Sequence, residues 1–217
     1  MRIAVFGASG GVGSEFVRLA VAQGHSVIAA YRQQPVQPVA GVDSIVGPDI
    51  LEESYISRVI VGADVVVSAI GLRRRHPANP WSRIVSPPDL TSRFAAALIA
   101  AMTKAGRPQR VLAISAAGVG DSRAKMNPLV RGLFDVSNVG VAYRDLEAME
   151  AAYAASTLDW LCVRPVTLTY GKGGASVRVV PYYGLLATVA RVDVAAYLLA
   201  RLADPGSYNE RTPMIAS

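Results

Sequence analysis

The sequence predicts an α/β fold, a doubly wound parallel sheet in one domain that spans residues 1–217. Apolar strand segments alternate with helical segments along the chain, and the strand segments are apolar at consecutive positions. Such strands are buried on both faces, as they are when helices cover both sides of a parallel sheet. Repeated strand–helix units build a sheet of this kind. No internal repeat or linker divides the sequence.

The individual elements follow from local patterns. Strands are expected at residues 2–6, 26–31, 44–46, 64–70, 110–115 and 158–163, and residues 213–216 are expected to close an edge of the sheet. Helices are expected at residues 14–23, 50–60, 89–105, 139–155 and 192–203. Gly24 and Gly106 end two of these helices, because glycine readily adopts the left-handed conformation found after a helix C-terminus.

Two stretches marked by glycine and proline, residues 118–137 and 167–190, resist assignment. Each follows the carboxyl end of a predicted strand, which is the edge where doubly wound sheets bind their ligands. We predict that both stretches form walls of a substrate pocket. Ordinary surface connections are the alternative.

Composition excludes several classes of protein. The longest apolar helical run, residues 94–102, is much shorter than the about 20 residues of a membrane span. A strand follows Met1 directly, which leaves no room for a secretory signal, and the single cysteine, Cys162, excludes an internal disulfide. We therefore expect a cytoplasmic protein without a membrane partner. His25 and His76 lack partners at ligand spacing, so no metal is predicted.

The net charge of +6 does not indicate a nucleic-acid partner, because the arginines lie at strand ends and in loops without a basic helix or aromatic platforms.

The most informative motif is a glycine-rich segment between the first predicted strand and the first predicted helix. Its members are Gly7, Ser9, Gly10, Gly11, Val12 and Gly13. Glycines let the backbone turn tightly and let phosphate oxygens come close, and the N–H groups of a helix start meet their negative charge. The motif departs from Gly-x-Gly-x-x-Gly, because Ser9 stands two residues after Gly7. We predict a site for the diphosphate of a dinucleotide; a plain strand–helix turn is the alternative.

The end of the second predicted strand indicates which dinucleotide binds. Domains that prefer NAD usually place a carboxylate there to bind the ribose hydroxyls. No Asp or Glu occurs between Glu15 and Asp43, and Arg32 stands about where the acid is expected. A guanidinium can hold a phosphate in that place. We predict NADP(H) in preference to NAD(H), with an ordinary exposed arginine as the alternative for Arg32.

Three consecutive arginines, Arg73, Arg74 and Arg75, follow the fourth predicted strand at the same edge of the sheet. They can steer an anionic cofactor or substrate, or form a solvated loop.

Several of these segments resemble the atypical short-chain dehydrogenase/reductases, which include the NAD(P)H-binding group of biliverdin-IXβ/flavin reductases and the NmrA-like regulators. The resemblance lies in the glycine motif, in residues 114–118, 156–165 and 191–199, and in Ser68, Ala69, Ile70 and Gly71. It implies a Rossmann-like subunit that binds NAD(P)H through the matching positions, Ser115 included. It also implies that Arg164 and Pro165 shape the turn into the substrate loop and that Asp193 caps or braces the last helix.

The candidate catalytic residues are Ser115 and Tyr143. Classical members of the resembled group use a Tyr-x-x-x-Lys pair, whereas Glu147 stands four residues after Tyr143, and a neighbouring carboxylate raises the pKa of a tyrosine. Tyr143 is a candidate proton donor, with packing or substrate contact as the alternative. Ser115 is a candidate to bind a developing oxyanion or the nicotinamide carboxamide, with a hydrogen bond to the next loop as the alternative.

The expected function is hydride transfer from NADPH to a small conjugated acceptor, anionic or neutral, such as a flavin, a quinone or a related carbonyl. Positioning supplies most of the catalysis in such reactions. The alternative is a non-catalytic, NmrA-like sensor of NADP(H). A nucleotide-sugar epimerase or dehydratase is disfavoured, because the Tyr–Lys pair is missing and few residues follow Pro165. A monomer and a homodimer both remain open.

Overall fold

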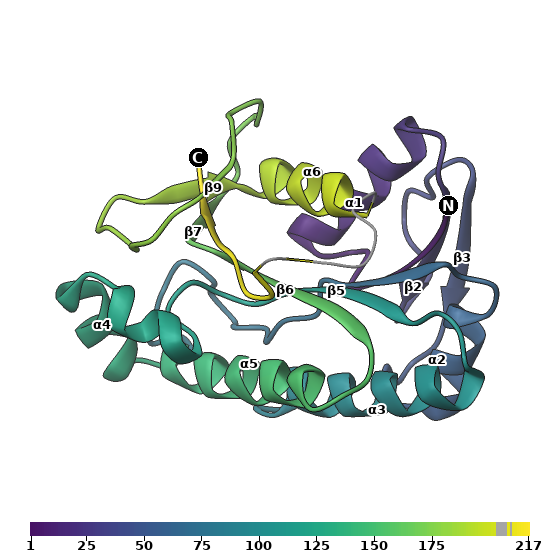
Figure 1. Cartoon of the computed structure of the whole chain (residues 1–217), viewed down its shortest axis with the longest axis horizontal. Helices are drawn as coiled ribbons and strands as arrows, with labels where there is room; N and C mark the ends of the chain where they lie inside the picture. The colour runs from purple at the N-terminus through teal and green to yellow at the C-terminus, as the bar shows by residue number, and fades with distance from the viewer. Residues whose placement is uncertain (203–207, 209) are drawn as a thin grey trace.

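The computed structural model describes residues 1–202, 208 and 210–217. Its main sheet has eight strands in the order β3-β2-β1-β4-β5-β6-β10-β8, all parallel except β8 (Figure 1). These strands are β1 (Arg2–Phe6), β2 (Ser26–Tyr31), β3 (Val42–Val46), β4 (Val65–Ser68), β5 (Arg110–Ile114), β6 (Asp159–Pro165), β8 (Arg178–Val179) and β10 (Met214–Ala216). The predicted fold class is confirmed.

The remaining elements connect or cover these strands. The helices are α1 (Gly11–Ala22), α2 (Glu53–Ile60), α3 (Leu90–Ala105), α4 (Pro128–Asp135), α5 (Val139–Ala154), α6 (Arg191–Arg201) and the 3-10 helix η1 (Gly120–Lys125). A separate parallel pair consists of β7 (Thr167–Thr169) and β9 (Thr188–Ala190). Of the two stretches that resisted assignment, residues 118–137 contain η1 and α4, and residues 167–190 contain β7, β8 and β9.

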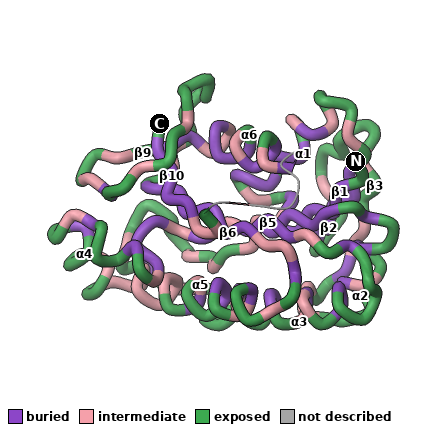
Figure 2. The backbone as a smooth tube through the Cα atoms, viewed as in Figure 1, coloured by how far each residue is buried: buried purple, intermediate pink, exposed green. Residues whose placement is uncertain are grey.

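Helices cover both faces of the sheet, which explains why its strands are apolar at consecutive positions. One layer contains α1 and α6, and the other contains α2, α3 and α5 (Figure 1). Along β1, Ile3 and Val5 belong to the first core, whereas Ala4 and Phe6 belong to the second. Figure 2 shows that buried residues concentrate in the strands and on the inner helix faces.

Several predictions for single elements are wrong. Helix α2 begins at Glu53 and not at residue 50, β3 begins at Val42 and not at residue 44, and β6 ends at Pro165 and not at residue 163. Helix α1 begins at Gly11 and not at residue 14, because the second half of the glycine motif already forms its first turn. Strand β4 ends at Ser68 and not at residue 70. Strand β10 is not an edge strand, since it pairs with β6 on one side and with β8 on the other. Residue 203, the predicted end of the last helix, lies outside the described residues.

The N-terminus of α3 is capped from α5 and not by its own preceding residue. The side chain of Asp89, at the N-cap position, makes no capping hydrogen bond. The carboxylate of Asp145 instead accepts hydrogen bonds from the backbone N–H groups of Thr91 (2.8 Å) and Ser92 (3.0 Å) and from the Thr91 hydroxyl. This buried carboxylate joins α5 to α3, whose first turn borders the cavity described below.

Replacing Asp145 by alanine is expected to lower the free energy of unfolding by about 2–3 kcal/mol, because three donors lose a charged acceptor in a buried place. Urea unfolding measures the change. The control is Asp89→Asn, which removes an exposed carboxylate that makes no cap and is expected to cost less than about 1 kcal/mol. Equal losses in the two variants would contradict the assignment of the cap.

Candidate functional site

The glycine loop after β1 forms an open anion-binding helix start. Gly7 has a φ of +77°, which favours glycine, and its carbonyl accepts a hydrogen bond from the N–H of Gly10 at 2.8 Å. Gly10 precedes α1 in an extended conformation, and no side chain caps the helix. The first turn contains no acidic side chain. The N–H groups at this end of α1 can therefore bind an anion, which the helix dipole also favours.

Close backbone contacts explain why the loop needs glycine at its two ends. A Cβ atom on Gly13 would lie 2.1 Å from the carbonyl oxygen of Gly7, and one on Gly7 would lie 2.5 Å from the carbonyl oxygen of Ala69. The N–H of Ala69 in turn donates to the carbonyl of Phe6 at 2.9 Å. The loop, the start of α1 and the chain after β4 are thus packed backbone against backbone.

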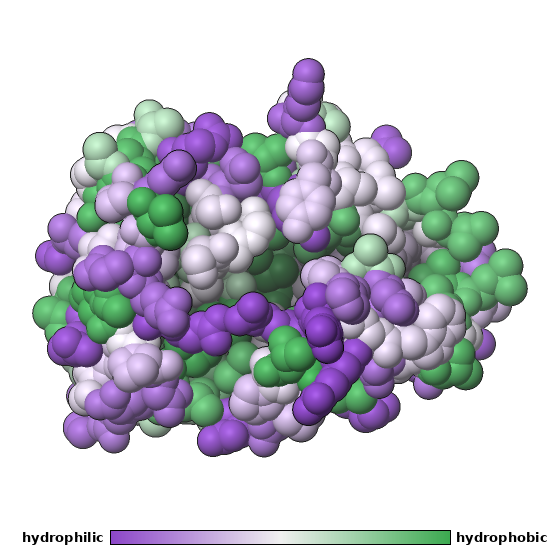
Figure 3. All heavy atoms as spheres, turned by 180° about the vertical axis from the view of Figure 1, so that it is seen from behind, coloured by the Kyte–Doolittle hydropathy of each residue, from purple (hydrophilic) through white to green (hydrophobic). Residues whose placement is uncertain are grey.

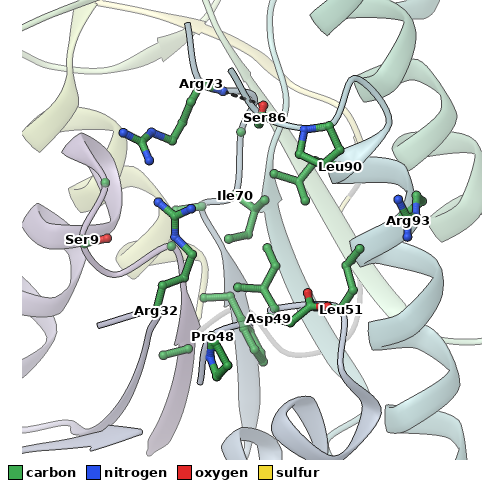
Figure 4. Close-up of a pocket in the computed structure, with 18 of the residues that line it drawn as sticks. Ser9, Arg32, Pro48, Asp49, Leu51, Ile70, Arg73, Ser86, Leu90 and Arg93 are labelled. Carbon is green, nitrogen blue, oxygen red and sulfur yellow. Dashed lines mark hydrogen bonds between the residues drawn. The ribbon is translucent and has the colours of Figure 1, made fainter. Parts of the chain in front are cut away.

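A cavity of about 490 Å³ opens beside this loop, at the carboxyl ends of β1, β2 and β4 (Figure 4). Seven of the residues predicted to bind the cofactor line it: Gly7, Ser9, Gly10, Arg32, Ala69, Ile70 and Gly71. Residues 48–51 and the start of α3 complete its wall. Gly11, Val12 and Gly13 form the first turn of α1, and Ser68 is the buried last residue of β4.

Two arginines give the cavity a positive rim. Arg32 follows β2, and Arg73 follows β4; both also line an adjoining pocket of about 540 Å³ together with Ser9. Figure 4 shows the two side chains reaching toward the same region beside Ser9. Within the described part of the chain, neither guanidinium forms an ion pair. The acidic lining residue, Asp49, accepts a hydrogen bond from the N–H of Leu51 at 2.9 Å.

Arg73 belongs to a hairpin that the sequence patterns did not indicate. The N–H of Val85 donates to the carbonyl of Arg73 at 2.8 Å. At the tip, the indole N–H of Trp81 donates to the carbonyl of Val136 at 3.2 Å, and the Asn138 amide donates back to the carbonyl of Trp81 at 2.8 Å. The hairpin is therefore tied to the connection between α4 and α5, which fixes the position of Arg73.

The two candidate catalytic residues lie outside the lining of this cavity, near the carboxyl end of β5. Ser115 is buried, and its hydroxyl makes no hydrogen bond to any described residue, so the alternative of a bond to the next loop is not seen. Tyr143 donates a hydrogen bond to the carbonyl of Ala117 at 2.8 Å and packs against the ring of Phe134.

Burial raises the pKa of Tyr143; Tyr183 raises it further, and the positive charge of Arg74 opposes the rise. The sequence predicted the direction of this shift but attributed it to Glu147, which is not among its causes.

Arg164 is a buried arginine that pairs with two carboxylates, which local patterns could not predict. Its guanidinium donates to the Glu150 carboxylate of α5 at 2.9 and 2.6 Å and to the Asp121 carboxylate of η1 at 2.6 Å. This arrangement lowers the pKa of Asp121. Arg164 of β6 thus joins η1 and α5 to the sheet.

The two stretches predicted to wall a pocket contribute no lining residue to the cavity beside the glycine loop. Both contribute to a separate pocket of about 360 Å³, lined among others by Asp121, Lys125 and Val179–Pro181. Figure 3 shows hydrophobic side chains gathered at the end of the molecule where α4 lies, and Leu129 and Val136 are exposed there.

Among the described residues, no group of three or more His, Cys, Asp or Glu side chains is placed to hold a metal. Nor does the described part of the chain contain a helix long and apolar enough to cross a bilayer.

Comparison with solved structures shows where this fold recurs. ChuY from Escherichia coli O157:H7, described as an anaerobillin reductase, gives a TM-score of 0.76 at 23% identity and covers 100% of this chain and 97% of that chain. The oxidoreductase ylbE from Lactococcus lactis gives 0.79 at 15% identity, covering 100% and 91%. A short-chain dehydrogenase/reductase from Veillonella parvula, solved with NADP, gives 0.78 at 14% identity, covering 100% and 94%.

No functionally curated protein matches the sequence. The model of the NAD(P)H-binding family matches residues 7–205, which include the glycine loop, the chain after β4 and α6. The family predicted from the motifs is confirmed, and the chain belongs to the NAD(P)H-binding family.

Proposed function

We propose that this protein is an NADPH-dependent oxidoreductase that reduces a small conjugated acceptor. The observation that carries the proposal is the cavity beside the glycine loop, which joins an uncapped helix start to two arginines without carboxylate partners among the described residues. An uncapped helix start suits a diphosphate, and a pair of guanidinium groups suits one further phosphate. When bound, NADPH supplies the hydride.

The preference for NADP(H) rests on charge. Arg32 stands at the end of β2, where an NAD-preferring domain places a carboxylate that repels a 2′-phosphate. Arg73 reaches the same region from the hairpin after β4 (Figure 4). Together the two guanidinium groups provide donors for two sides of a phosphate. The carboxylate of Asp49, which also lines the cavity, accepts a hydrogen bond from the N–H of Leu51.

A conjugated acceptor suits the catalytic groups that are present. Reduction of a carbonyl to an alcohol requires a proton donor of adjusted pKa. The Tyr143 hydroxyl instead donates a hydrogen bond to the carbonyl of Ala117, and burial raises its pKa. A flavin or quinone takes the hydride into a ring system, and water can supply the proton. The buried, unpartnered hydroxyl of Ser115 is a candidate to bind the nicotinamide carboxamide or a developing oxyanion.

The Tyr143 hydroxyl is hydrogen-bonded to the carbonyl of Ala117, which also favours a second candidate function: a sensor that binds NADP(H) without turnover. Steady-state oxidation of NADPH with a panel of flavins, quinones and carbonyls separates the two. Turnover with any of these acceptors supports the reductase. Micromolar coenzyme binding without turnover supports the sensor.

The coenzyme preference is tested by calorimetric titration with NADPH and NADH. Arg32→Gln and Arg73→Gln are each expected to weaken NADPH binding by about tenfold to hundredfold and to change NADH binding by less than about threefold, because the charge-assisted hydrogen bonds lost are those to the extra phosphate. Arg75→Gln is the matched control, since Arg75 lies in the same hairpin but outside the cavity lining. Tighter binding of NADH than NADPH by the wild type would refute the preference.

The pH dependence of turnover tests the source of the proton. Because burial raises the pKa of Tyr143, its hydroxyl stays neutral through pH 10, and we expect no alkaline decline near pH 10 from this group. Tyr143→Phe should keep the rate within about threefold, since water supplies the proton. A loss of about a hundredfold or more, with unchanged coenzyme affinity, would instead assign the proton to Tyr143.

A further inference from the structure

Arg191, the first residue of α6, lies against the glycine loop although 180 positions separate it from Gly11 in the sequence. A Cβ atom on Gly11 would lie 2.6 Å from Cδ of Arg191 and 2.8 Å from its Nε. Helices α1 and α6 pack side by side on the same face of the sheet, and their first turns meet there (Figure 1). The absence of a side chain at Gly11 is what admits the arginine.

An aromatic ring fixes the other side of this guanidinium. Cζ of Arg191 lies 3.9 Å from the centroid of the Tyr170 ring, a close cation–π contact. The loop after Tyr170 is tied to α6, because the N–H of Gly174 donates to the Asp193 carboxylate at 2.8 Å. Asp193 therefore braces the loop against α6, while the N-cap position, Ala190, has no side-chain cap.

The charge of Arg191 is left without a counter-ion. Its Nη1 atom is buried and has no hydrogen-bond partner, and no carboxylate pairs with it in residues 1–202, 208 and 210–217. A buried donor on a charged group without an acceptor is costly. A cation is also unfavourable at the start of α1, because the helix dipole is positive there. An anion between Arg191 and the α1 start would remove both costs.

We propose that Arg191 binds the diphosphate of the coenzyme and closes the anion site of the glycine loop from the side of α6. The inference rests on the proposed coenzyme binding, though not on the preference for NADP(H). Arg32 and Arg73 act on the 2′-phosphate, which only NADP(H) carries. Arg191 acts on the diphosphate, which NAD(H) and NADP(H) share. Loss of Arg32 or Arg73 should therefore weaken binding of NADPH alone, whereas loss of Arg191 should weaken binding of NADPH and NADH alike.

The experiment compares three ligands by calorimetry: NADPH, NADH and adenosine 2′-monophosphate, which lacks the diphosphate. Arg191→Gln is expected to weaken NADPH and NADH alike, by about tenfold or more, because one charge-assisted contact is lost. Binding of adenosine 2′-monophosphate should change by less than about threefold, as expected for a contact with the diphosphate alone. Arg18→Gln is the matched control, since it removes an exposed positive charge from α1 itself and should leave all three affinities unchanged.

Two further variants keep the test decisive if Arg191→Gln does not fold. Arg191→Lys keeps the charge and should recover part of the lost affinity. Tyr170→Leu removes an exposed ring that positions the guanidinium, and should weaken both coenzymes by about twofold to fivefold without lowering the melting temperature.

The outcomes separate this inference from the proposed function. The role of Arg191 alone is overturned if the wild-type protein binds both coenzymes and the Arg191→Gln and Tyr170→Leu variants bind them equally well. Weaker binding of NADPH and adenosine 2′-monophosphate with unchanged NADH would also overturn it, because Arg191 would then act on the 2′-phosphate. Wild-type protein that binds neither coenzyme overturns the proposed function and this inference together.

Discussion

The close backbone contact between the glycine loop and the chain after β4 is the constraint on which the rest of the site depends. Gly13 approaches the carbonyl of Gly7, and Gly7 approaches the carbonyl of Ala69, at separations that admit no Cβ atom. This contact aims the start of α1 at the edge of the sheet. It also brings the residue after β4 beside the loop, so that one cavity is bordered by the connections that follow β1, β2, β3 and β4. A side chain at either glycine would separate these parts.

Positive charge converges on the glycine loop and the cavity beside it from three distant parts of the sequence. Arg32 comes from the end of β2, Arg73 from the hairpin after β4, and Arg191 from the start of α6. None of them forms an ion pair with a described residue. Uncompensated charge beside an uncapped helix start raises the free energy of the empty protein, and an anionic ligand with several phosphates lowers it again. These three arginines thus favour binding of an anionic ligand and do not stabilise the protein when no ligand is bound.

The parts of this site that were predictable are those encoded by neighbouring residues. The strand before the glycine motif, the helix after it and the position of Arg32 follow from periodicity and spacing. Helix α1 begins three residues earlier than predicted, because Gly11, Val12 and Gly13 are weak helix formers that join the helix only through tertiary contact.

The parts that could not be predicted depend on contacts between residues far apart in the sequence. The cap on α3 comes from Asp145, 54 positions from Thr91. The hairpin that carries Arg73 is fixed by Trp81 through Val136, 55 positions away. No local pattern encodes such pairs, and Arg191 stood in a recognised motif without an evident role until its contact with Gly11 was known.

The central claim is that the start of α1 and the chain after β4 hold the diphosphate-bearing coenzyme. Hydrogen–deuterium exchange of the wild-type protein, with and without NADP⁺, tests this location directly. The account predicts slower exchange of the backbone amides of residues 9–12 and 69–71 when NADP⁺ is added, and unchanged exchange in α4. Unchanged exchange at residues 9–12, at a concentration of NADP⁺ that saturates binding, would contradict it.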